Sequence, residues 1–272
     1  MKKFLALLLA LVMVFALAAC GGDDGDATAS AQPTAGASGA PDDGETAGVP
    51  EDFKVGFIFL HDENSTYDLN FINAATAAIE ELGLTEDQYE FRYNVPEDQS
   101  CYDAAAELAD DGCDIIFADS FGHESYIIQA AQEFEDVQFC HSTGTRAHTE
   151  GLANYHNAFA SIYEGRYLAG TVAGLKLNEM NANGEITEDE AKMGYVGAYT
   201  YAEVLSGYTS FYLGAKSVCP SVTMDVTFTG SWYSETDERE AANNLIAGGC
   251  VLISQHADSM GAPSACEEHG VP

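Results

Sequence analysis

The sequence predicts an α/β fold with two lobes, each built on a parallel sheet that is flanked by helices. From residue 53 onward, apolar runs of strand length alternate regularly with alanine-rich segments of helical period. Many of these helical segments end in Gly or Asp-Gly, as in DDGC and AGGC, which is typical of helix C-termini. Regular alternation of this kind favours parallel sheets with helices on both faces.

Taken in order, the apolar runs predict strands and the segments between them predict helices. Strands are expected at 54–60, 89–95, 114–118, 137–140, 153–156, 193–197, 222–228 and 250–254. Helices are expected at 70–82, 100–110, 124–134, 158–177, 202–217, 235–247 and 262–269. The helix around 162–177 contains small residues that allow close packing against a neighbour, and it is expected to open the second lobe. The predicted lobes cover residues 53–150 and 151–272.

The first 19 residues have the build of an export signal. Lys2 and Lys3 precede an apolar run over 4–19, which is shorter than the roughly 20 residues that a membrane-spanning helix needs. The run ends in LAAC, which resembles a bacterial lipobox, so Cys20 is expected to be lipid-modified and to begin the mature chain. The alternative is an ordinary secretory signal followed by a chance cysteine. A lipidated Cys20 would anchor the protein to the cell membrane, facing the extracytoplasmic side.

Residues 20–52 are expected to form a disordered acidic linker between this anchor and the folded body. They are nearly all small, polar or acidic, and Val49 is the one large apolar side chain after Cys20. Such a segment cannot bury enough surface to offset the entropy of ordering it. Folding is therefore expected to begin near Phe53.

The charge balance excludes some partners without naming one. The chain has 44 acidic and 10 basic residues, and its formal net charge is −34. An anionic surface of this density repels nucleic acid and other bulk anions, so no nucleic-acid partner is expected. Otherwise the charge indicates a solubilising surface and says little about a ligand.

The remaining cysteines show no spacing of metal ligands. They allow many disulfide pairings outside the cytoplasm, but several are expected to be buried small apolar residues instead. Cys113 and Cys250, for example, each follow a glycine and open a predicted strand. The set comprises Cys101, Cys113, Cys140, Cys219, Cys250 and Cys266.

Clusters of polar and aromatic residues follow most of the predicted strands. They read HDENS at 61–65, DSFGH at 119–123, HSTG at 141–144, YTY at 199–201, TGSW at 229–232 and QHAD at 255–258. The carboxyl ends of parallel strands meet at one sheet edge, where ligands of α/β proteins bind. Helix capping explains one such residue in each loop, but not the neighbouring Tyr, Trp and His. Two lobes with polar loops facing each other predict a hinged binding protein.

Several motifs, in this order, resemble the basic membrane protein family. They are KVGFIF, DIIFADSFGH, EGRYLAGTVAGL, KMGYVGAY, GAKSV and GSWYSETDEREAANNLIAGG, preceded by the lipobox and the acidic linker. The family consists of substrate-binding lipoproteins of ABC transporters, is related to purine nucleoside receptors and has a type I periplasmic-binding fold. The resemblance covers essentially the whole body from residue 53 onward.

The resemblance implies a site in which aromatic side chains hold a purine ring and acid or amide groups read its edge. By position, Asp62 and Asn64 would be edge readers and Tyr67 a stacking residue. The loops after later strands would complete the site in the cleft. The implied ligand-binding residues are Asp62, Asn64, Tyr67, Ser120, Phe121, Tyr199, Tyr201, Trp232, His256 and Asp258.

The chain departs from the family's pattern in two places. The family's receptors continue past the segment matching SQHADSMGAPSACEEHGVP, through a further strand and an Asp-rich loop, so a C-terminally truncated fold is expected, with an incomplete second lobe. In the first loop the family often has an Asp, an aromatic residue and an Asn, whereas this chain has DENSTYD.

The function expected from these features is that of a membrane-tethered receptor, with no cofactor, that delivers a small ligand, a purine nucleoside, to the permease of an ABC importer. The same fold with a sugar or autoinducer-like ligand is the first alternative, because aromatic faces and carboxylates also hold sugars. A metal receptor is the second, but the histidines form no HxH or HxxxH pair. An enzyme would use Asp62, His123, His141, His256 or Asp258, yet no catalytic motif accompanies them, so no enzyme is expected.

Overall fold

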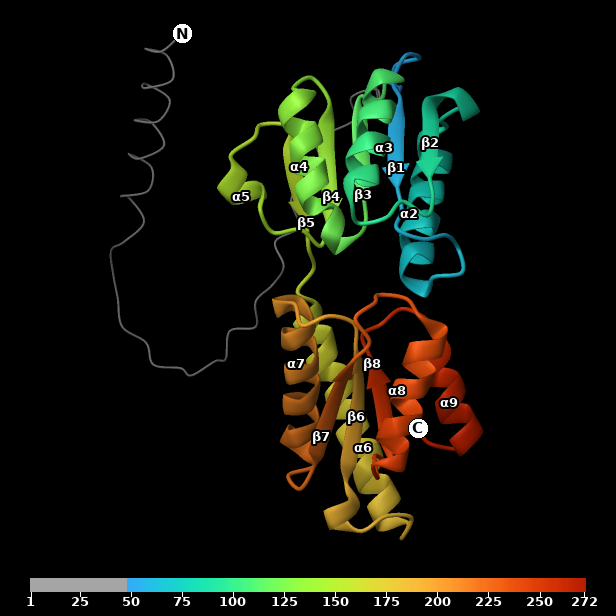
Figure 1. Cartoon of the computed structure of the whole chain (residues 1–272), viewed down its shortest axis with the longest axis vertical. Helices are drawn as coiled ribbons and strands as arrows, with labels where there is room; N and C mark the ends of the chain where they lie inside the picture. Colours follow the sequence, from blue (N-terminus) through green and yellow to red (C-terminus); the bar gives the residue numbers. More distant parts are fainter. Residues whose placement is uncertain (1–47) are drawn as a thin grey trace, which may run out of the picture. The chain divides into compact units, whose positions relative to one another are not determined.

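The computed structural model describes residues 48–272. The predicted signal peptide at 1–19, Cys20 and most of the predicted linker at 20–52 lie outside the described residues. Strands and helices alternate along the chain (Figure 1). The first set comprises β1 Val55–Ile58, α2 Thr66–Leu82, β2 Tyr89–Arg92, α3 Gln99–Asp110, β3 Ile115–Ala118, α4 Glu124–Glu133, β4 Gln138–Ser142, α5 Ala147–Glu150 and β5 Tyr155–Ala158. The second comprises α6 Ile162–Ala182, β6 Lys192–Gly197, α7 Ala202–Val218, β7 Thr223–Phe228, α8 Glu235–Ala247, β8 Leu252–Gln255 and α9 Gly261–His269.

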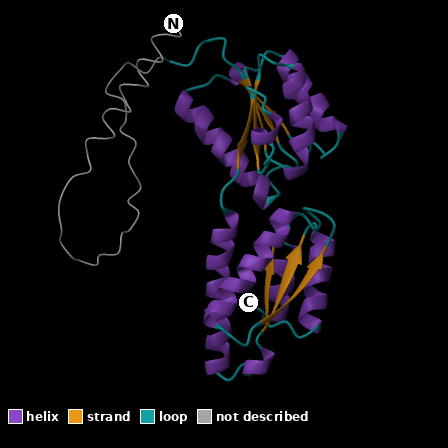
Figure 2. Cartoon of the chain, turned by 90° about the vertical axis from the view of Figure 1, so that its left-hand side faces the viewer, coloured by secondary structure: helices purple, strands orange, loops and turns teal. Residues whose placement is uncertain are grey.

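The first lobe contains a parallel five-stranded sheet in the order β2-β1-β3-β4-β5. Its register places Val55 of β1 between Tyr89 of β2 and Ile115 of β3. The second lobe contains a parallel three-stranded sheet in the order β7-β6-β8. In each lobe the strands form a layer between helices (Figure 2). The predicted α/β architecture with two parallel sheets flanked by helices is confirmed.

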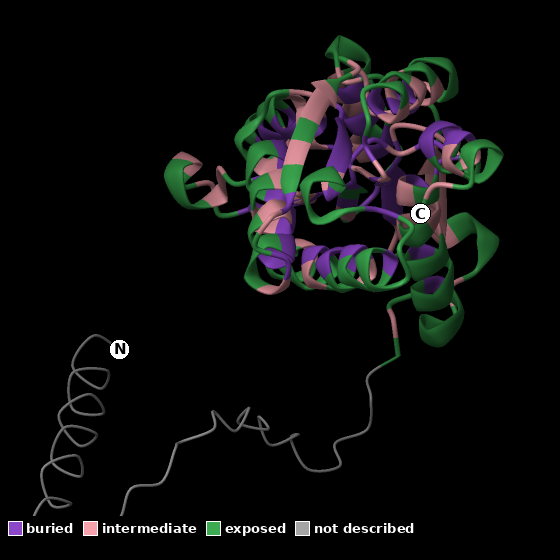
Figure 3. Ribbon diagram, turned by 90° about the horizontal axis from the view of Figure 1, so that it is seen from below, coloured by how far each residue is buried: buried purple, intermediate pink, exposed green. Residues whose placement is uncertain are grey.

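Each sheet has an apolar core on both faces. In the first lobe, α3 and α4 pack on one face around Leu108, Ile116 and Phe139, while α2 packs on the other around Phe57 and Ile79. In the second lobe, α6 and α7 cover the face that carries Met193 and Tyr195, and α8 and α9 cover the opposite face. Buried residues are concentrated in the strands and on the inward sides of the helices (Figure 3). Alternate strand residues point to opposite faces, so both faces need apolar side chains.

The structure differs from the predicted elements at two points that affect the site. Helix α2 begins at Thr66 rather than at residue 70, because the Ser65 hydroxyl accepts a hydrogen bond from the Asp68 backbone N–H and caps the helix. Tyr67 therefore lies in the first helical turn. Strand β5 pairs with β4 in the first sheet, so residues 151–158 lie with the first lobe, although the predicted boundary was residue 150. The chain passes from the first lobe to the second after β5.

The described cysteines are free, and four of them, Cys101, Cys113, Cys219 and Cys250, are buried. Cys113 and Cys250 pack in the apolar cores as expected. Among residues 48–272, no helix combines the length and the apolar character needed to span a membrane.

Candidate functional site

A cavity of about 430 Å³ is lined by side chains from both lobes. Ligand pockets for small molecules have volumes of roughly 300 to 1,000 Å³. The lining mixes aromatic faces with a few polar and charged groups. It comprises Leu60, Tyr67, Phe71, Ser120, Phe121, Ser142, Thr143, Ala158, Phe159, Ala160, Ile162, Arg166, Glu203, Trp232, His256 and Asp258.

Aromatic rings from both lobes meet beside this cavity. Phe121, after β3, lies 5.1 Å from Tyr201, before α7, measured between ring centroids. Trp232, after β7, lies 5.3 Å from Tyr199 in an edge-to-face arrangement and 6.1 Å from Tyr201. Aromatic pairs favour such offset and edge-to-face geometries at separations of about 4.5 to 7 Å. Phe121 and Trp232 also line the cavity, so two aromatic residues of this cluster are available to a ligand.

Glu97 connects the two lobes at this point. Its Oε1 accepts hydrogen bonds from the Ser120 hydroxyl at 2.5 Å and from the Gly122 backbone N–H at 2.7 Å, which holds the loop after β3. The same oxygen accepts a bond from the indole N–H of Trp232 at 3.1 Å. A second bond between the lobes runs from the Thr66 hydroxyl to the backbone oxygen of Asp258, at 3.0 Å.

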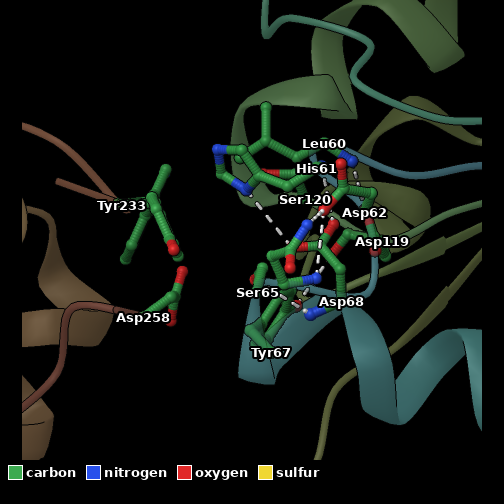
Figure 4. A network of polar contacts seen from close by, with 12 residues as sticks. Leu60, His61, Asp62, Ser65, Tyr67, Asp68, Asp119, Ser120, Tyr233 and Asp258 are labelled. Atoms are coloured by element: carbon green, nitrogen blue, oxygen red, sulfur yellow. Dashed lines mark hydrogen bonds and ion pairs between the residues drawn. The ribbon is translucent and has the colours of Figure 1, made fainter. Parts of the chain in front are cut away.

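A polar network lies at the amino end of α2 (Figure 4). The carboxylate of Asp68 is fully buried and accepts bonds from the His61 backbone N–H at 2.9 Å and from the His61 ring at 3.2 Å. Burial acts to raise the pKa of Asp68, but hydrogen bonding with His61 and Ser65 outweighs it and holds the pKa below its ordinary value. Asp68 is therefore a fixed negative charge close to the cavity.

Asp119 interacts with Asp68, and its pKa is shifted in the opposite direction. Burial, followed by repulsion from Asp68, raises the pKa of Asp119 well above its ordinary value. One carboxyl oxygen of Asp119 accepts a bond from the Leu60 backbone N–H at 3.2 Å, and the other has no hydrogen-bond partner among the described residues. The backbone oxygen of Asp119 accepts a 2.7 Å bond from the Tyr67 hydroxyl, which orients that ring in the cavity wall.

The second lobe contributes a wall of charged side chains. A carboxylate oxygen of Glu203, in the first turn of α7, lies 2.8 Å from Nε2 of His256, and the other nitrogen of that ring lies 3.2 Å from the Tyr195 hydroxyl. Arg166, on α6, donates a 3.1 Å bond to the backbone oxygen of Gln255. These contacts tie the start of both helices to the end of β8.

Asp258 lies in the same wall, across from Tyr67 (Figure 4). Burial, with repulsion from Asp68 and Glu238, raises the pKa of Asp258 to about 8. The loop that carries it is held by the fully buried Glu238, whose carboxylate accepts bonds from the backbone N–H groups of Ser234 at 2.9 Å and Ser259 at 3.1 Å. These hydrogen bonds hold the loop that carries Asp258.

The structure brings six of the residues named from sequence to the cavity wall: Tyr67, Ser120, Phe121, Trp232, His256 and Asp258. Tyr199 and Tyr201 pack against Trp232 and Phe121 without lining the cavity. Asp62 and Asn64 bond to each other at 2.8 Å and also lie outside the lining. The Asn64 backbone N–H, followed by its side chain, lowers the pKa of Asp62.

Sequence reasoning missed Glu97, Arg166 and Glu203, and it placed Thr143 in the polar cluster at 141–144 without naming it as a ligand-binding residue. Arg166 and Glu203 lie on helices rather than at strand ends, and Glu97 is in the loop after β2, whose polar residues resemble an ordinary helix start. Thr143 lines the cavity with a φ of 69°, a left-handed conformation that a β-branched residue rarely adopts. Such strain is found at functional sites, but it has no signature in a single sequence.

The histidines that a metal receptor would use do not form a cluster of metal ligands among the described residues. His123 and His141 are buried, and one ring nitrogen of each bonds to the backbone oxygen of Val95 or Ser120. Burial lowers the pKa of His141 to about 4, which favours its neutral form. Within residues 48–272, the structure contains no group of three His, Cys, Asp or Glu side chains that could hold a metal ion.

Comparison with known proteins identifies relatives over most of the folded body. Residues 58–272 match the model of a family described as ABC transporter substrate-binding protein, PnrA-like. A purine-binding protein of Brucella abortus is 33% identical over 84% of this chain and 61% of its own length. A putative ABC transporter glucose-binding protein of Haloferax volcanii is 31% identical over 86% of this chain and 54% of its own length. This chain thus spans less than two thirds of either relative.

Solved structures support the same fold. An ABC transporter solute-binding protein from Conexibacter woesei superposes with a TM-score of 0.60 and 25% identity. The superposition covers 81% of this chain and 69% of that chain. The match confirms the predicted periplasmic-binding type of fold.

Proposed function

Because the chain belongs to the family of PnrA-like ABC transporter substrate-binding proteins, we propose that it captures a purine nucleoside between its lobes and passes it to the permease of an ABC importer. Substrate-binding proteins of this family bind and release their ligands without chemical conversion.

The observation that carries the proposal is the composition of the cavity. Trp232, Phe121 and Tyr67 supply aromatic faces, and Arg166, Glu203 and Asp258 supply hydrogen-bonding groups. A nucleobase has a flat apolar face and a polar edge, and its stacking on an aromatic side chain contributes roughly 1–3 kcal/mol. The polar groups around the rings are suited to reading the edge and the ribose hydroxyls, and they reject analogues that leave them unpaired.

The contacts between the lobes suggest how capture and release work. Both lobes contribute side chains to the cavity, so a ligand gains its full set of contacts only when the lobes approach each other. The Trp232–Glu97 and Thr66–Asp258 hydrogen bonds also form when the lobes are close together. Ligand binding would then favour the closed state, which is the form that a permease can distinguish from the empty receptor.

The lipobox-like LAAC sequence supports a location for this activity. We propose that Cys20 carries lipid and that residues 20–52 tether the body to the extracytoplasmic side of the cell membrane. In that position the receptor would remain close to the permease. Mass spectrometry of Cys20 in protein purified from membranes tests this part independently of the ligand.

A sugar is the second candidate ligand. The relative from Haloferax volcanii is described as glucose-binding, and aromatic faces with carboxylates also suit pyranose rings. The aromatic cluster at the cavity favours the nucleoside, because Phe121 and Trp232 come from different lobes and both border the space.

Isothermal titration calorimetry with a panel of nucleosides, free bases and monosaccharides tests the proposal. We expect saturable binding of at least one purine nucleoside and much weaker binding of pyrimidine nucleosides and glucose. Binding of a monosaccharide without any purine nucleoside would overturn the nucleoside assignment and leave the receptor assignment in place. Zinc, added as a separate ligand, tests the metal alternative.

A further inference from the structure

Among residues 48–272, Arg166 is the arginine that has no carboxylate partner. Arg92, Arg146 and Arg239 each form an ion pair with an acidic side chain. No carboxylate of the described residues lies within 4.0 Å of the Arg166 guanidinium, although the chain has 44 acidic residues. Its one hydrogen bond within residues 48–272 uses Nη1. The other donors of this half-buried side chain remain available at the cavity wall.

The surrounding charges restrict what Arg166 can bind. A guanidinium has five N–H donors in a rigid planar arrangement and no acceptor, so its partner must supply acceptor atoms. Glu203 and Asp258 line the same cavity, and the buried Asp68 is close enough to Asp258 to raise its pKa. Glu203 would repel a carboxylate or phosphate on the ligand, whereas Asp258, with its pKa raised to about 8, is largely protonated at neutral pH and can donate as well as accept. An uncharged ligand edge with acceptors for Arg166 and a neighbouring donor for Glu203 satisfies both side chains.

The edge of a 6-oxopurine has this pattern. Guanine and hypoxanthine present the N7 and O6 acceptors side by side, which an arginine binds with two parallel hydrogen bonds. Their N1–H donor lies next to O6 and suits a carboxylate. Adenine has an amino donor in place of O6, so a guanidinium facing that edge meets N–H groups and can form only one of the two bonds.

We propose that Arg166 makes the cavity selective for purines with an oxygen at C6 over purines with an amino group there. The inference rests on the proposed function, because it specifies the ligand of the same site. A good bidentate contact of this kind discriminates against the wrong base by about 10- to 100-fold. Guanosine and inosine should therefore bind more tightly than adenosine by a factor in that range.

Helices α6 and α7 hold Arg166 and Glu203 in place at the cavity. Arg166 lies near the start of α6, and Gly170, one turn further, is in backbone contact with Phe211 of α7. Glu203 lies in the first turn of α7, where its carboxylate contacts the His256 ring at 2.8 Å. The close packing of α6 and α7 thus sets the spacing between the arginine donors and the carboxylate acceptors.

The test compares guanosine and adenosine affinities in calorimetric titrations of the wild-type protein, Arg166→Gln and Arg166→Lys. A glutamine amide can donate to N7 and accept from the adenine amino group, so Arg166→Gln should bring the guanosine-to-adenosine preference to about one or invert it. Arg166→Lys keeps the charge and can still donate to O6 and N7 but lacks the planar fork of donors, so it should keep only part of the preference while the protein remains folded. Thermal unfolding verifies that both variants fold.

Arg239→Gln is the matched control, because Arg239 pairs with Glu268 outside the cavity. We expect its preference to equal that of the wild type. Equal wild-type affinities for guanosine and adenosine, or an equal loss for both in Arg166→Gln, would overturn the inference while leaving the nucleoside assignment intact. A wild-type protein that binds no nucleoside would overturn the proposed function and this inference with it.

Discussion

Replacing Trp232 with alanine is expected to weaken the binding of a purine nucleoside by about 10- to 100-fold. The substitution removes an aromatic face from the cavity wall and the indole N–H that bonds to Glu97 across the lobes. Stacking of a base on such a face contributes roughly 1–3 kcal/mol, which accounts for the expected range. Calorimetric titration of the purified variant measures the loss.

Trp232→Phe separates the two contributions. It keeps a smaller aromatic face and removes the indole N–H bond to Glu97, so the expected loss of affinity is smaller than in Trp232→Ala. The variants should unfold at temperatures close to that of the wild type, because Trp232 is only partly buried and belongs to neither core of the second lobe. A Trp232→Ala protein that binds the nucleoside as tightly as the wild type would remove this residue from the site.

Gly170→Ala is expected to cost at least about 3 kcal/mol of unfolding free energy. A Cβ atom at Gly170 would lie 2.6 Å from the carbonyl carbon of Phe211 and closer still to its oxygen, so the backbones of α6 and α7 must move apart. Overpacking usually costs about 1–3 kcal/mol, and rigid backbone atoms cannot relax as a flexible side chain does. Chemical denaturation monitored by circular dichroism measures the change.

Gly165→Ala, on the same helix, is the matched control. A Cβ atom there meets no atom within 4 Å beyond its chain neighbours and the backbone of its own helix, so the substitution brings the better helix propensity of alanine. Its expected effect is a gain of up to about 1 kcal/mol. If Gly170→Ala proves as stable as the control, the two helices are not in the close contact described here, and the placement of Arg166 and Glu203 loses its support.

The fold could be predicted from sequence because its signals are local and repeated. The apolar runs and the glycines that follow the helical segments indicate every strand and every helix of the described body except the short α5, and parallel pairing follows from their alternation. The start of α2 was misplaced because Ser65 was interpreted as part of a polar site cluster and also acts as the helix cap. The lobe boundary was placed before β5 because sequence order alone does not show which sheet a short strand joins.

The site could be predicted only where its residues follow strands. Phe121, Trp232 and Asp258 occur after strand ends and line the cavity. The role of Arg166 could not be predicted, because its motif indicates only a helix. The structure is needed to show that this residue lines the cavity and has no carboxylate partner among residues 48–272. The buried pair of Asp68 and Asp119 was missed for a similar reason, because their opposite pKa shifts depend on mutual distance and burial. The roles of Asp62 and Asn64 in ligand binding remain predictions. In the structure the two side chains bond to each other and lie outside the cavity lining.

The fluorescence of Trp232 tests the central claim most directly, because it is the only tryptophan of the chain and it lines the cavity between the lobes. Titration with a purine nucleoside should change its emission saturably, with a midpoint equal to the dissociation constant from calorimetry. Nucleoside binding that is detected by calorimetry but leaves the emission unchanged at saturation would place the ligand elsewhere and contradict the proposed site.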